Sequence, residues 1–336
     1  MARVLDIARV LDSRRGEIMR VLVTGAAGFI GSHLAARLLG RGHVVVGLDN
    51  FDPFYDPALK ERNAAALADY AGFTLVRGDI RHEGLVGGLL GRAPGCESVV
   101  HLAALAGVRP SIAQPLRYAA VNVTGTLTLL EACRAAGLKR FVFASSSSVY
   151  GAHSAVPFRE SDPAVRPASP YAATKRAGEL CCSSYTDLFG LDTCALRFFT
   201  VYGPRQRPEM AIHKFARLIA AGRPVPFFGD GRSARDYTFI DDIIDGVVAA
   251  VERQPPGHTV YNLGGSRTTT LARLVELVAA ALGKEAILDR QPDQPGDVPI
   301  TYADVTQAGR DLGYAPKVPI EEGIARFVEW FRAQPA

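Results

Sequence analysis

The stretch Met19-Arg-Val-Leu-Val-Thr-Gly25-Ala-Ala-Gly28-Phe-Ile-Gly31 decides the fold. Its apolar start predicts a short buried strand, and the residues after the glycines predict a helix that runs to about Leu39. Strand, glycine turn and helix in this order are typical of a dinucleotide site. Gly25 permits the tight turn, Gly28 lets the backbone approach a pyrophosphate, and Gly31 lets the helix pack on the strand.

A second strand is predicted directly after this unit, at residues 43–48. Asp49 follows it at about the offset where an acid binds both hydroxyls of the adenosine ribose. A carboxylate there repels a 2′-phosphate, and no arginine follows directly, so NAD is favoured over NADP. The alternative, a structural turn with a capping aspartate, stays open at this point.

Further strands are predicted at residues 73–76, 98–102, 141–146 and 193–199, with helices between them. This alternation predicts an α/β fold with a doubly wound parallel sheet, the Rossmann type. Ligands of such folds gather at the carboxyl ends of the strands. Together with Tyr171 and Lys175, the candidate cofactor residues are Gly25, Gly28, Phe29, Ile30, Gly31, Asp49, Asn50, Asp79, Ile80, Leu102, Ala103, Ala104 and Asn122. Asn122 lies on a helix predicted from about Tyr118 to Ala136.

The chemistry is predicted where the run Phe141-Val-Phe-Ala-Ser-Ser-Ser-Ser-Val-Tyr-Gly151 ends in four hydroxyls. Tyr171 and Lys175 lie four residues apart on the next predicted helix, so they share a face. A free phenol is a poor base at neutral pH, but a neighbouring ammonium favours the phenolate and lowers the pKa. We therefore predict that Tyr171 is a general base, and that a serine at the end of the strand donates a hydrogen bond to the same substrate oxygen. A surface tyrosine beside a solvated lysine is the alternative.

Composition limits the classes of partner. The 336 residues carry a net charge of +4 without a basic run, which argues against nucleic acid. No apolar stretch approaches the roughly 18 residues of a membrane helix, so a soluble protein is expected. Five cysteines without paired C-x-x-C spacing predict reduced thiols in a cytoplasm and no metal site. His33 and His101, each inside an apolar run, are expected to be packing residues.

The sequence predicts three regions. Residues 1–18 form an extension in which a short amphipathic helix is possible, and a frayed or mis-assigned start is favoured over a functional arm. Residues 19–199, completed by about 236–263, form the NAD-binding domain. Residues 200–235 and 264–333 form a smaller interleaved region whose basic loops face an anion. Asp241 and Asp242 open an amphipathic helix and are interpreted as caps rather than metal ligands.

Several motifs together resemble the extended short-chain dehydrogenases/reductases that act on nucleotide-sugars, and within them the bacterial UDP-glucuronate 4-epimerases. The resemblance covers Met19 to near the C-terminus. It is carried by Leu48-Asp-Asn-Phe-Asp-Pro-Phe-Tyr-Asp-Pro-Ala-Leu-Lys60, Leu105-Ala-Gly-Val-Arg-Pro-Ser111, Ala144-Ser-Ser-Ser-Ser-Val-Tyr-Gly151, Tyr171-Ala-Ala-Thr-Lys-Arg176, Arg197-Phe-Phe-Thr-Val-Tyr-Gly203, Arg207-Pro-Glu-Met-Ala211 and Arg235-Asp-Tyr-Thr-Phe-Ile-Asp-Asp242.

This resemblance implies a role for each candidate residue. Tyr171 would be the base, Lys175 its partner, and Ser146 the hydroxyl on O4 of a UDP-sugar. Arg235 would hold a diphosphate oxygen, Phe228 would lie near uracil, and Arg207 would meet the sugar carboxylate. The candidate substrate residues are Arg109, Ser146, Ser147, Ser148, Thr200, Arg207, Met210, Phe228, Arg235 and Asp297. A homodimer paired through the helices of Tyr118 and Tyr171 is also implied.

The same resemblance separates epimerisation from elimination. Related decarboxylases and 4,6-dehydratases have an acid two residues before the tyrosine that ends this strand motif, whereas the chain has Ser148 there. Without a carboxylate at 147 or 148, the acid or base that those eliminations need is missing. A UDP-glucose or UDP-N-acetylglucosamine 4-epimerase and a non-catalytic NAD-sensing protein remain as alternatives. Arg205 is an additional basic residue beside Arg207, and could share its role.

Overall fold

The computed structural model describes residues 18–91, 95–151, 155–253, 255–292 and 298–334. Two predictions lie outside these residues: the possible helix before residue 18, and the role of Asp297. Within them, no helix is both long and apolar enough to cross a membrane.

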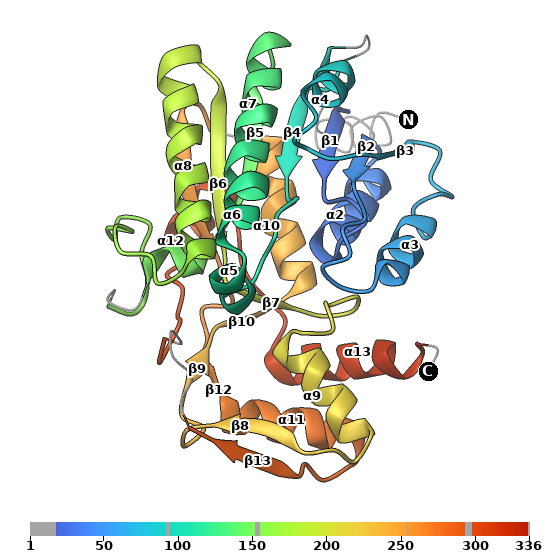
Figure 1. Ribbon diagram of the computed structural model, residues 1–336, viewed down its shortest axis with the longest axis vertical. Helices are drawn as coiled ribbons and strands as arrows, with labels where there is room; N and C mark the ends of the chain where they lie inside the picture. Colours follow the sequence, from blue (N-terminus) through green and yellow to red (C-terminus); the bar gives the residue numbers. More distant parts are fainter. Residues whose placement is uncertain (1–17, 92–94, 152–154, 254, 293–297, 335–336) are drawn as a thin grey trace, which may run out of the picture.

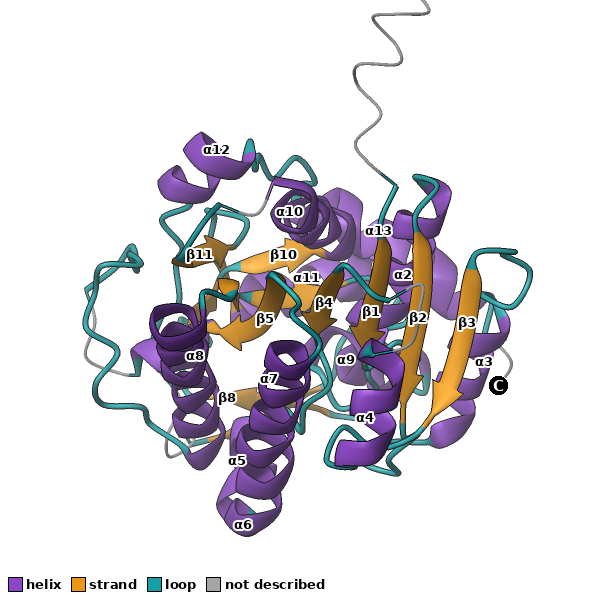
Figure 2. Cartoon of the chain, turned by 90° about the horizontal axis from the view of Figure 1, so that it is seen from above, coloured by secondary structure: helices purple, strands orange, loops and turns teal. Residues whose placement is uncertain are grey.

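A seven-stranded parallel sheet forms the centre of the molecule (Figure 2). The strand order is β11-β6-β5-β4-β1-β2-β3, so the direction of winding reverses between β1 and β4. The predicted α/β, doubly wound parallel fold is confirmed. The strands are β1 Arg20–Thr24, β2 Val44–Asp49, β3 Phe73–Arg77, β4 Ser98–His101, β5 Arg140–Ser146, β6 Asp192–Phe198 and β11 His258–Leu263.

Helices cover both faces of this sheet, because its central strands are apolar on both sides. On one face, Leu38 of α2 (Phe29–Gly40) and Val247 of α10 (Ile240–Arg253) enter the same buried cluster. On the other face, a second buried cluster contains side chains from α4 (Glu83–Leu90), α7 (Gly125–Ala135) and α8 (Pro170–Phe189). The remaining helices beside the sheet are α3 Pro57–Ala65, α5 Val108–Ala113, α6 Pro115–Tyr118 and α12 Thr306–Leu312, with a 3₁₀ turn at Ser147–Tyr150.

The helix predicted from Tyr118 to Ala136 is not one continuous α-helix. A π-helical stretch, Ala119–Thr124, separates α6 from α7. Asn122 lies in this stretch and is buried, and its side chain bonds the backbone of Leu105 on both the N–H and the carbonyl and donates to Thr174 Oγ1. These three partners lie far along the chain, so the local apolar spacing could not predict the wider turn.

A smaller set of elements lies below the carboxyl edge of the sheet (Figure 1). Its amphipathic helices pack together through buried apolar faces, for example Ile219 of α9 with Leu274 of α11 in one cluster. The division of the chain into an NAD-binding and a substrate-binding domain stays a prediction. The elements are β7 Thr200–Tyr202, α9 Ala211–Ala220, β8 Val225–Phe228, β9 Ala234–Arg235, β10 Tyr237–Phe239, β12 Thr269–Thr270, α11 Leu271–Leu282, β13 Leu288–Gln291 and α13 Ile320–Arg332.

Asp241 and Asp242 lie in the first turn of α10, as predicted, but the carboxylate of Asp242 binds another segment of the chain rather than the end of this helix. This carboxylate accepts the backbone N–H groups of Lys317 and Val318 at 3.0 and 3.1 Å, and so joins α10 to the segment that precedes α13. Asp241 forms an ion pair with Arg326 of α13. Both acids therefore act between helices, through partners more than 70 residues away.

Candidate active site

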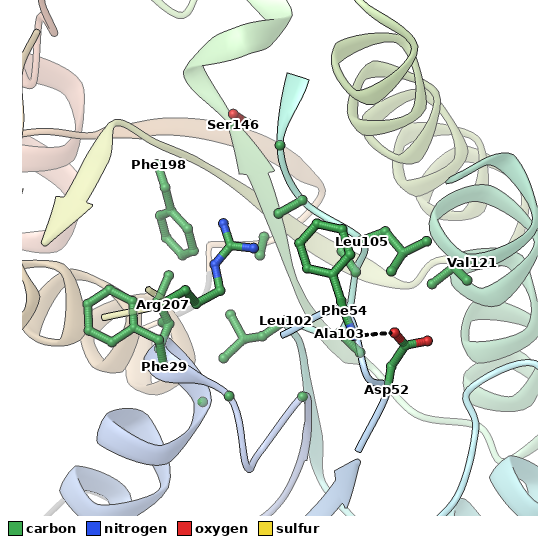
Figure 3. Close-up of a pocket in the computed structure, with 18 of the residues that line it drawn as sticks. Phe29, Asp52, Phe54, Leu102, Ala103, Leu105, Val121, Ser146, Phe198 and Arg207 are labelled. Atoms are coloured by element: carbon green, nitrogen blue, oxygen red, sulfur yellow. Dashed lines mark hydrogen bonds between the residues drawn. The ribbon is translucent and has the colours of Figure 1, made fainter. Parts of the chain in front are cut away.

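A cavity of about 380 Å³ opens at the carboxyl ends of β1, β2, β4 and β5, where the sequence predicts ligand binding. It brings together most of the candidate residues from segments far apart in the chain (Figure 3). They are Gly25, Gly28, Phe29, Ile30, Gly31, Asp49, Asn50, Asp79, Ile80, Leu102, Ala103, Ala104, Ser146, Ser147, Ser148, Tyr171, Lys175, Thr200, Arg207 and Met210.

The glycine turn at one end of the cavity has the geometry of a pyrophosphate cradle. Gly25 has a φ of +71°, and a Cβ at Gly31 would lie 2.0 Å from the Gly25 carbonyl oxygen. No side chain caps the start of α2 at Gly28, so the first N–H groups of the helix face the cavity without a side-chain acceptor. These residues fit NAD.

Asp49 lies buried where a ribose is expected. Its Oδ2 accepts the N–H of Ala27 at 3.1 Å and its Oδ1 accepts the N–H of Phe51 at 2.8 Å. Beside it, Asn50 donates to Asp79 at 2.9 Å. The guanidinium of Arg81 holds the pKa of Asp79 well below its usual range. Hydrogen bonds and an ion pair therefore fix the positions of the Asp49 and Asp79 carboxylates in the wall of the cavity, where the adenosine is expected.

Tyr171, Ser146 and Lys175 meet at the end of β5, and the first and last of them lie on one face of α8, as predicted from their spacing. Lys175 is buried on α8, and its Nζ donates to the carbonyl oxygen of Ala144 at 2.7 Å. Burial lowers the pKa of Lys175 to about 8, and the charge of Glu179 acts in the opposite direction. The Ser146 hydroxyl also accepts the N–H of Ser148 at 3.2 Å.

The pKa of Tyr171 differs from the sequence-based expectation. Burial raises it above the usual value of a phenol, while a hydrogen bond with Ser146 and the charge of Arg207 act in the opposite direction. The expected lowering by the Lys175 ammonium is not found. The reason is geometric, because this ammonium is directed to the Ala144 carbonyl on the neighbouring strand.

Arg207 enters the same cavity from the loop that precedes α9, and its side chain is 19% exposed (Figure 3). Its guanidinium forms an ion pair with Glu209 at 2.9 Å and lies 5.8 Å from the ring centre of Phe54. It also lines a wider, more open cleft that adjoins the cavity and contains Arg109, Lys214 and other basic residues.

Four candidate residues of the described part of the chain do not line the first cavity: Asn122, Arg109, Phe228 and Arg235. Arg109 lies in the adjoining cleft, with its guanidinium 5.5 Å from the ring centre of Phe228. Arg235 donates to the carbonyl oxygen of Ala234 at 3.0 Å. Asn122 contacts the cavity only indirectly, because its side chain forms hydrogen bonds with the backbone of Leu105, which lines it. Arg205 lines a separate small cavity beside α3 and α13, away from the Arg207 guanidinium.

Sequence reasoning did not assign a role to Phe54, Tyr55 or Lys60, which line this cavity. Lys60 is buried, donates to the carbonyl oxygen of Asp52 at 2.9 Å and lies 4.9 Å from the ring centre of Tyr55. The sequence marks them only through the quoted stretch from Leu48 to Lys60, in which residues 50–56 form an aromatic and polar loop between β2 and α3 and Lys60 lies on α3. Its individual contacts depend on the folding of the loop over the cavity.

One cavity contains a nucleotide cradle, a ribose acid and a half-buried tyrosine with a buried lysine. This arrangement defines an NAD-dependent enzyme of the short-chain dehydrogenase/reductase class. The chain belongs to the NAD dependent epimerase/dehydratase family, whose model matches residues 21–264. It is an NAD-dependent epimerase, an isomerase.

Curated and solved relatives cover nearly the whole chain. A probable UDP-glucuronate 4-epimerase of Rhizobium meliloti is 41% identical over 332 residues, covering 93% of this chain and 97% of the relative. The UDP-glucuronic acid 4-epimerase of Bacillus cereus, solved with UDP-glucuronic acid and NAD, is 37% identical with a TM-score of 0.86, covering 94% and 99%. A UDP-glucose 4-epimerase of Thermotoga maritima, solved with UDP-glucose, is 34% identical with a TM-score of 0.85, covering 94% and 99%.

Proposed function

We propose that the protein interconverts UDP-glucuronate and UDP-galacturonate through a transient 4-keto sugar, without loss of CO₂. The observation that carries the proposal is Arg207, a cation directed into the cavity that also holds Tyr171 and Ser146. The relatives named UDP-glucuronate 4-epimerase support the same substrate.

The roles of the protein groups follow from their positions. Tyr171 takes the proton from O4 of the sugar and later returns it. Ser146 donates a hydrogen bond to O4, and Lys175 supplies positive charge behind the phenol. NAD held in this cavity would supply the hydride chemistry at C4 of the sugar. The glycine turn, Asp49 and the end of β4 hold the cofactor, and Arg109, Phe228 and Arg235 hold the nucleotide of the substrate.

Retention of the carboxylate is the specific problem of this substrate, because a 4-keto glucuronate is a β-keto acid. We infer that Arg207 fixes the carboxylate away from the orientation that expels CO₂. Three carboxylates from described residues line the cavity, and all lie in or after β2 and β3: Asp49, Asp52 and Asp79. Ser147 and Ser148 leave the reactive end without an acid for elimination.

Two variants from one loop test this assignment. Arg207→Gln removes the cation that faces the cavity. Arg205→Gln removes a cation two residues earlier in the chain, which lines a different cavity. We expect Arg207→Gln to lower kcat/KM for UDP-glucuronate by about 100-fold, since a buried charge loses its partner. Arg205→Gln should stay within about two-fold, as for a change remote from the substrate.

Product analysis of the same variants separates the competing substrates. If Arg207→Gln releases CO₂ and forms a UDP-pentose, the carboxylate-fixing role is supported directly. If the wild-type enzyme instead turns over UDP-glucose or UDP-N-acetylglucosamine and Arg207→Gln has no effect, the substrate assignment is wrong. Absence of turnover on all three sugars would favour the non-catalytic alternative.

We further propose a cytoplasmic homodimer in which residues 200–235 and 264–333 form the nucleotide-sugar-binding domain. Cytoplasmic location is supported by five cysteines that are all free thiols. Dimer formation is supported by exposed apolar side chains on helices that contact one another, Ile112 of α5, Leu116 of α6 and Leu180 of α8, which are 59%, 84% and 53% exposed. Such side chains gain free energy when a second copy covers them.

A further inference from the structure

A buried carboxylate that the mechanism does not use lies directly behind the reactive groups. Glu179 of α8 is 0% exposed and accepts four hydrogen bonds. The guanidinium of Arg197 on β6 donates to both of its oxygens, at 2.8 and 2.9 Å. Arg176 donates at 2.8 Å, and the Ser145 hydroxyl donates at 2.5 Å. These donors hold the pKa of Glu179 below its usual range despite its burial, so it carries a full negative charge.

The position of Glu179 on α8 relates it to both catalytic side chains. Tyr171, Lys175 and Glu179 follow one another at intervals of four residues, so they lie on one face of the helix. Their partners are three consecutive residues of β5. Lys175 bonds the carbonyl of Ala144, Glu179 bonds the hydroxyl of Ser145, and Tyr171 meets Ser146. The middle contact therefore fixes the register of the helix against the end of the strand.

The charges around Lys175 make Glu179 its electrostatic partner. Of the acids in the described residues, Glu179, one helical turn away, is the one whose charge raises the pKa of this lysine. On β4, His101 is buried with a pKa lowered to about 3, so it is neutral. On β6, Arg197 is bound to both oxygens of Glu179, and burial raises the pKa of Tyr171 on the same helix as Lys175.

We propose that Glu179 is a positioning residue of the epimerase, which acts through Ser145 on the strand end that carries Ser146 and through its charge on the Lys175 ammonium. This inference rests on the proposed function, in which Lys175 works as a cation behind Tyr171. A purely structural Glu179 would only join α8 to β6 through Arg197. The two roles differ in one respect, because only the positioning role moves the pH dependence of turnover.

Glu179→Gln tests the charge. Removing the anion lowers the pKa of Lys175 further, so the ammonium is lost at lower pH and the alkaline limb of kcat/KM should shift down by about one pH unit. Glu252→Gln is the matched control. Glu252 lies on α10, accepts a hydrogen bond from Arg41 at 2.7 Å, and does not line the cavity. Its profile should coincide with the wild type. An unshifted limb in a folded, active Glu179→Gln enzyme would overturn the proposal.

A second pair of variants covers the case in which Glu179→Gln leaves Arg197 unpaired and does not fold. Ser145→Ala removes one neutral donor and keeps every charge. We expect kcat to fall about five- to ten-fold with KM for UDP-glucuronate within two-fold, and Ser145→Thr, which keeps the hydroxyl, to restore kcat. Wild-type kcat in Ser145→Ala would contradict the positioning role. Lack of turnover by the wild-type enzyme would instead contradict the proposed function itself.

Discussion

At the scale of single residues, burial dominates the chemistry of the site. It raises the pKa of Tyr171 and lowers that of Lys175, the reverse of what a solvated tyrosine–lysine pair would do. We predict that Tyr171→Phe lowers turnover of UDP-glucuronate by about 10³-fold, the usual contribution of a general acid–base group. Binding of UDP-glucuronate, measured by calorimetry, should change by no more than a few-fold because the ring is retained. Turnover above one tenth of wild type would exclude Tyr171 as the base.

Both residues of this pair were predictable from the sequence, since their spacing and the serine run are local patterns. Their pKa values were not, because these depend on burial beneath segments far along the chain. Glu179 was missed for a related reason. Its spacing from Lys175 is visible in the sequence, but the partners that give it a function, Ser145 and Arg197, come from two other strands.

At the scale of elements, the β1 turn and α2 must approach closely for the cofactor to bind. A Cβ at Gly31 would lie 2.0 Å from the Gly25 oxygen, whereas a Cβ at Gly40, at the other end of the same helix, would meet no atom within 4 Å. We predict that Gly31→Ala loses bound NAD and has a lower melting temperature. Gly40→Ala should keep its NAD and gain up to about 1 kcal/mol of stability. A full NAD content in Gly31→Ala, assayed after acid release, would contradict this reading of the turn.

Most strands, and the doubly wound parallel type of the sheet, could be predicted from the sequence. Apolar runs that end in glycine or hydroxyl residues are typical of buried parallel strands. The π-helical stretch around Asn122 and the inter-helix role of Asp242 could not be predicted, since each depends on partners that only the folded chain brings close. Elements were therefore predictable where a local pattern decides them, and unpredictable where a distant backbone group does.

At the scale of the whole molecule, the site lies between the carboxyl edge of the sheet and the smaller set of elements below it (Figure 1). The exposed apolar side chains Ile112, Leu116 and Leu180 belong to α5, α6 and α8, three helices that contact one another. We predict that Leu180→Arg converts a dimer to a monomer in light scattering at about 10 μM, because the charge prevents apolar burial. Ile287→Arg is the matched control, since Ile287 is 55% exposed beside β13. A monomeric wild type would contradict the proposed homodimer, and a dimeric Leu180→Arg protein would place its interface elsewhere.

The most direct test of the proposed function is proton NMR of UDP-glucuronate incubated with the purified protein and no added cofactor. The account predicts that UDP-galacturonate appears without release of CO₂, because NAD stays bound and the two positions that follow Ser146 are serines rather than acids. A UDP-pentose product would show that Arg207 and the serine run do not protect the carboxylate. Conversion of UDP-glucose, with UDP-glucuronate unchanged, would contradict the central claim.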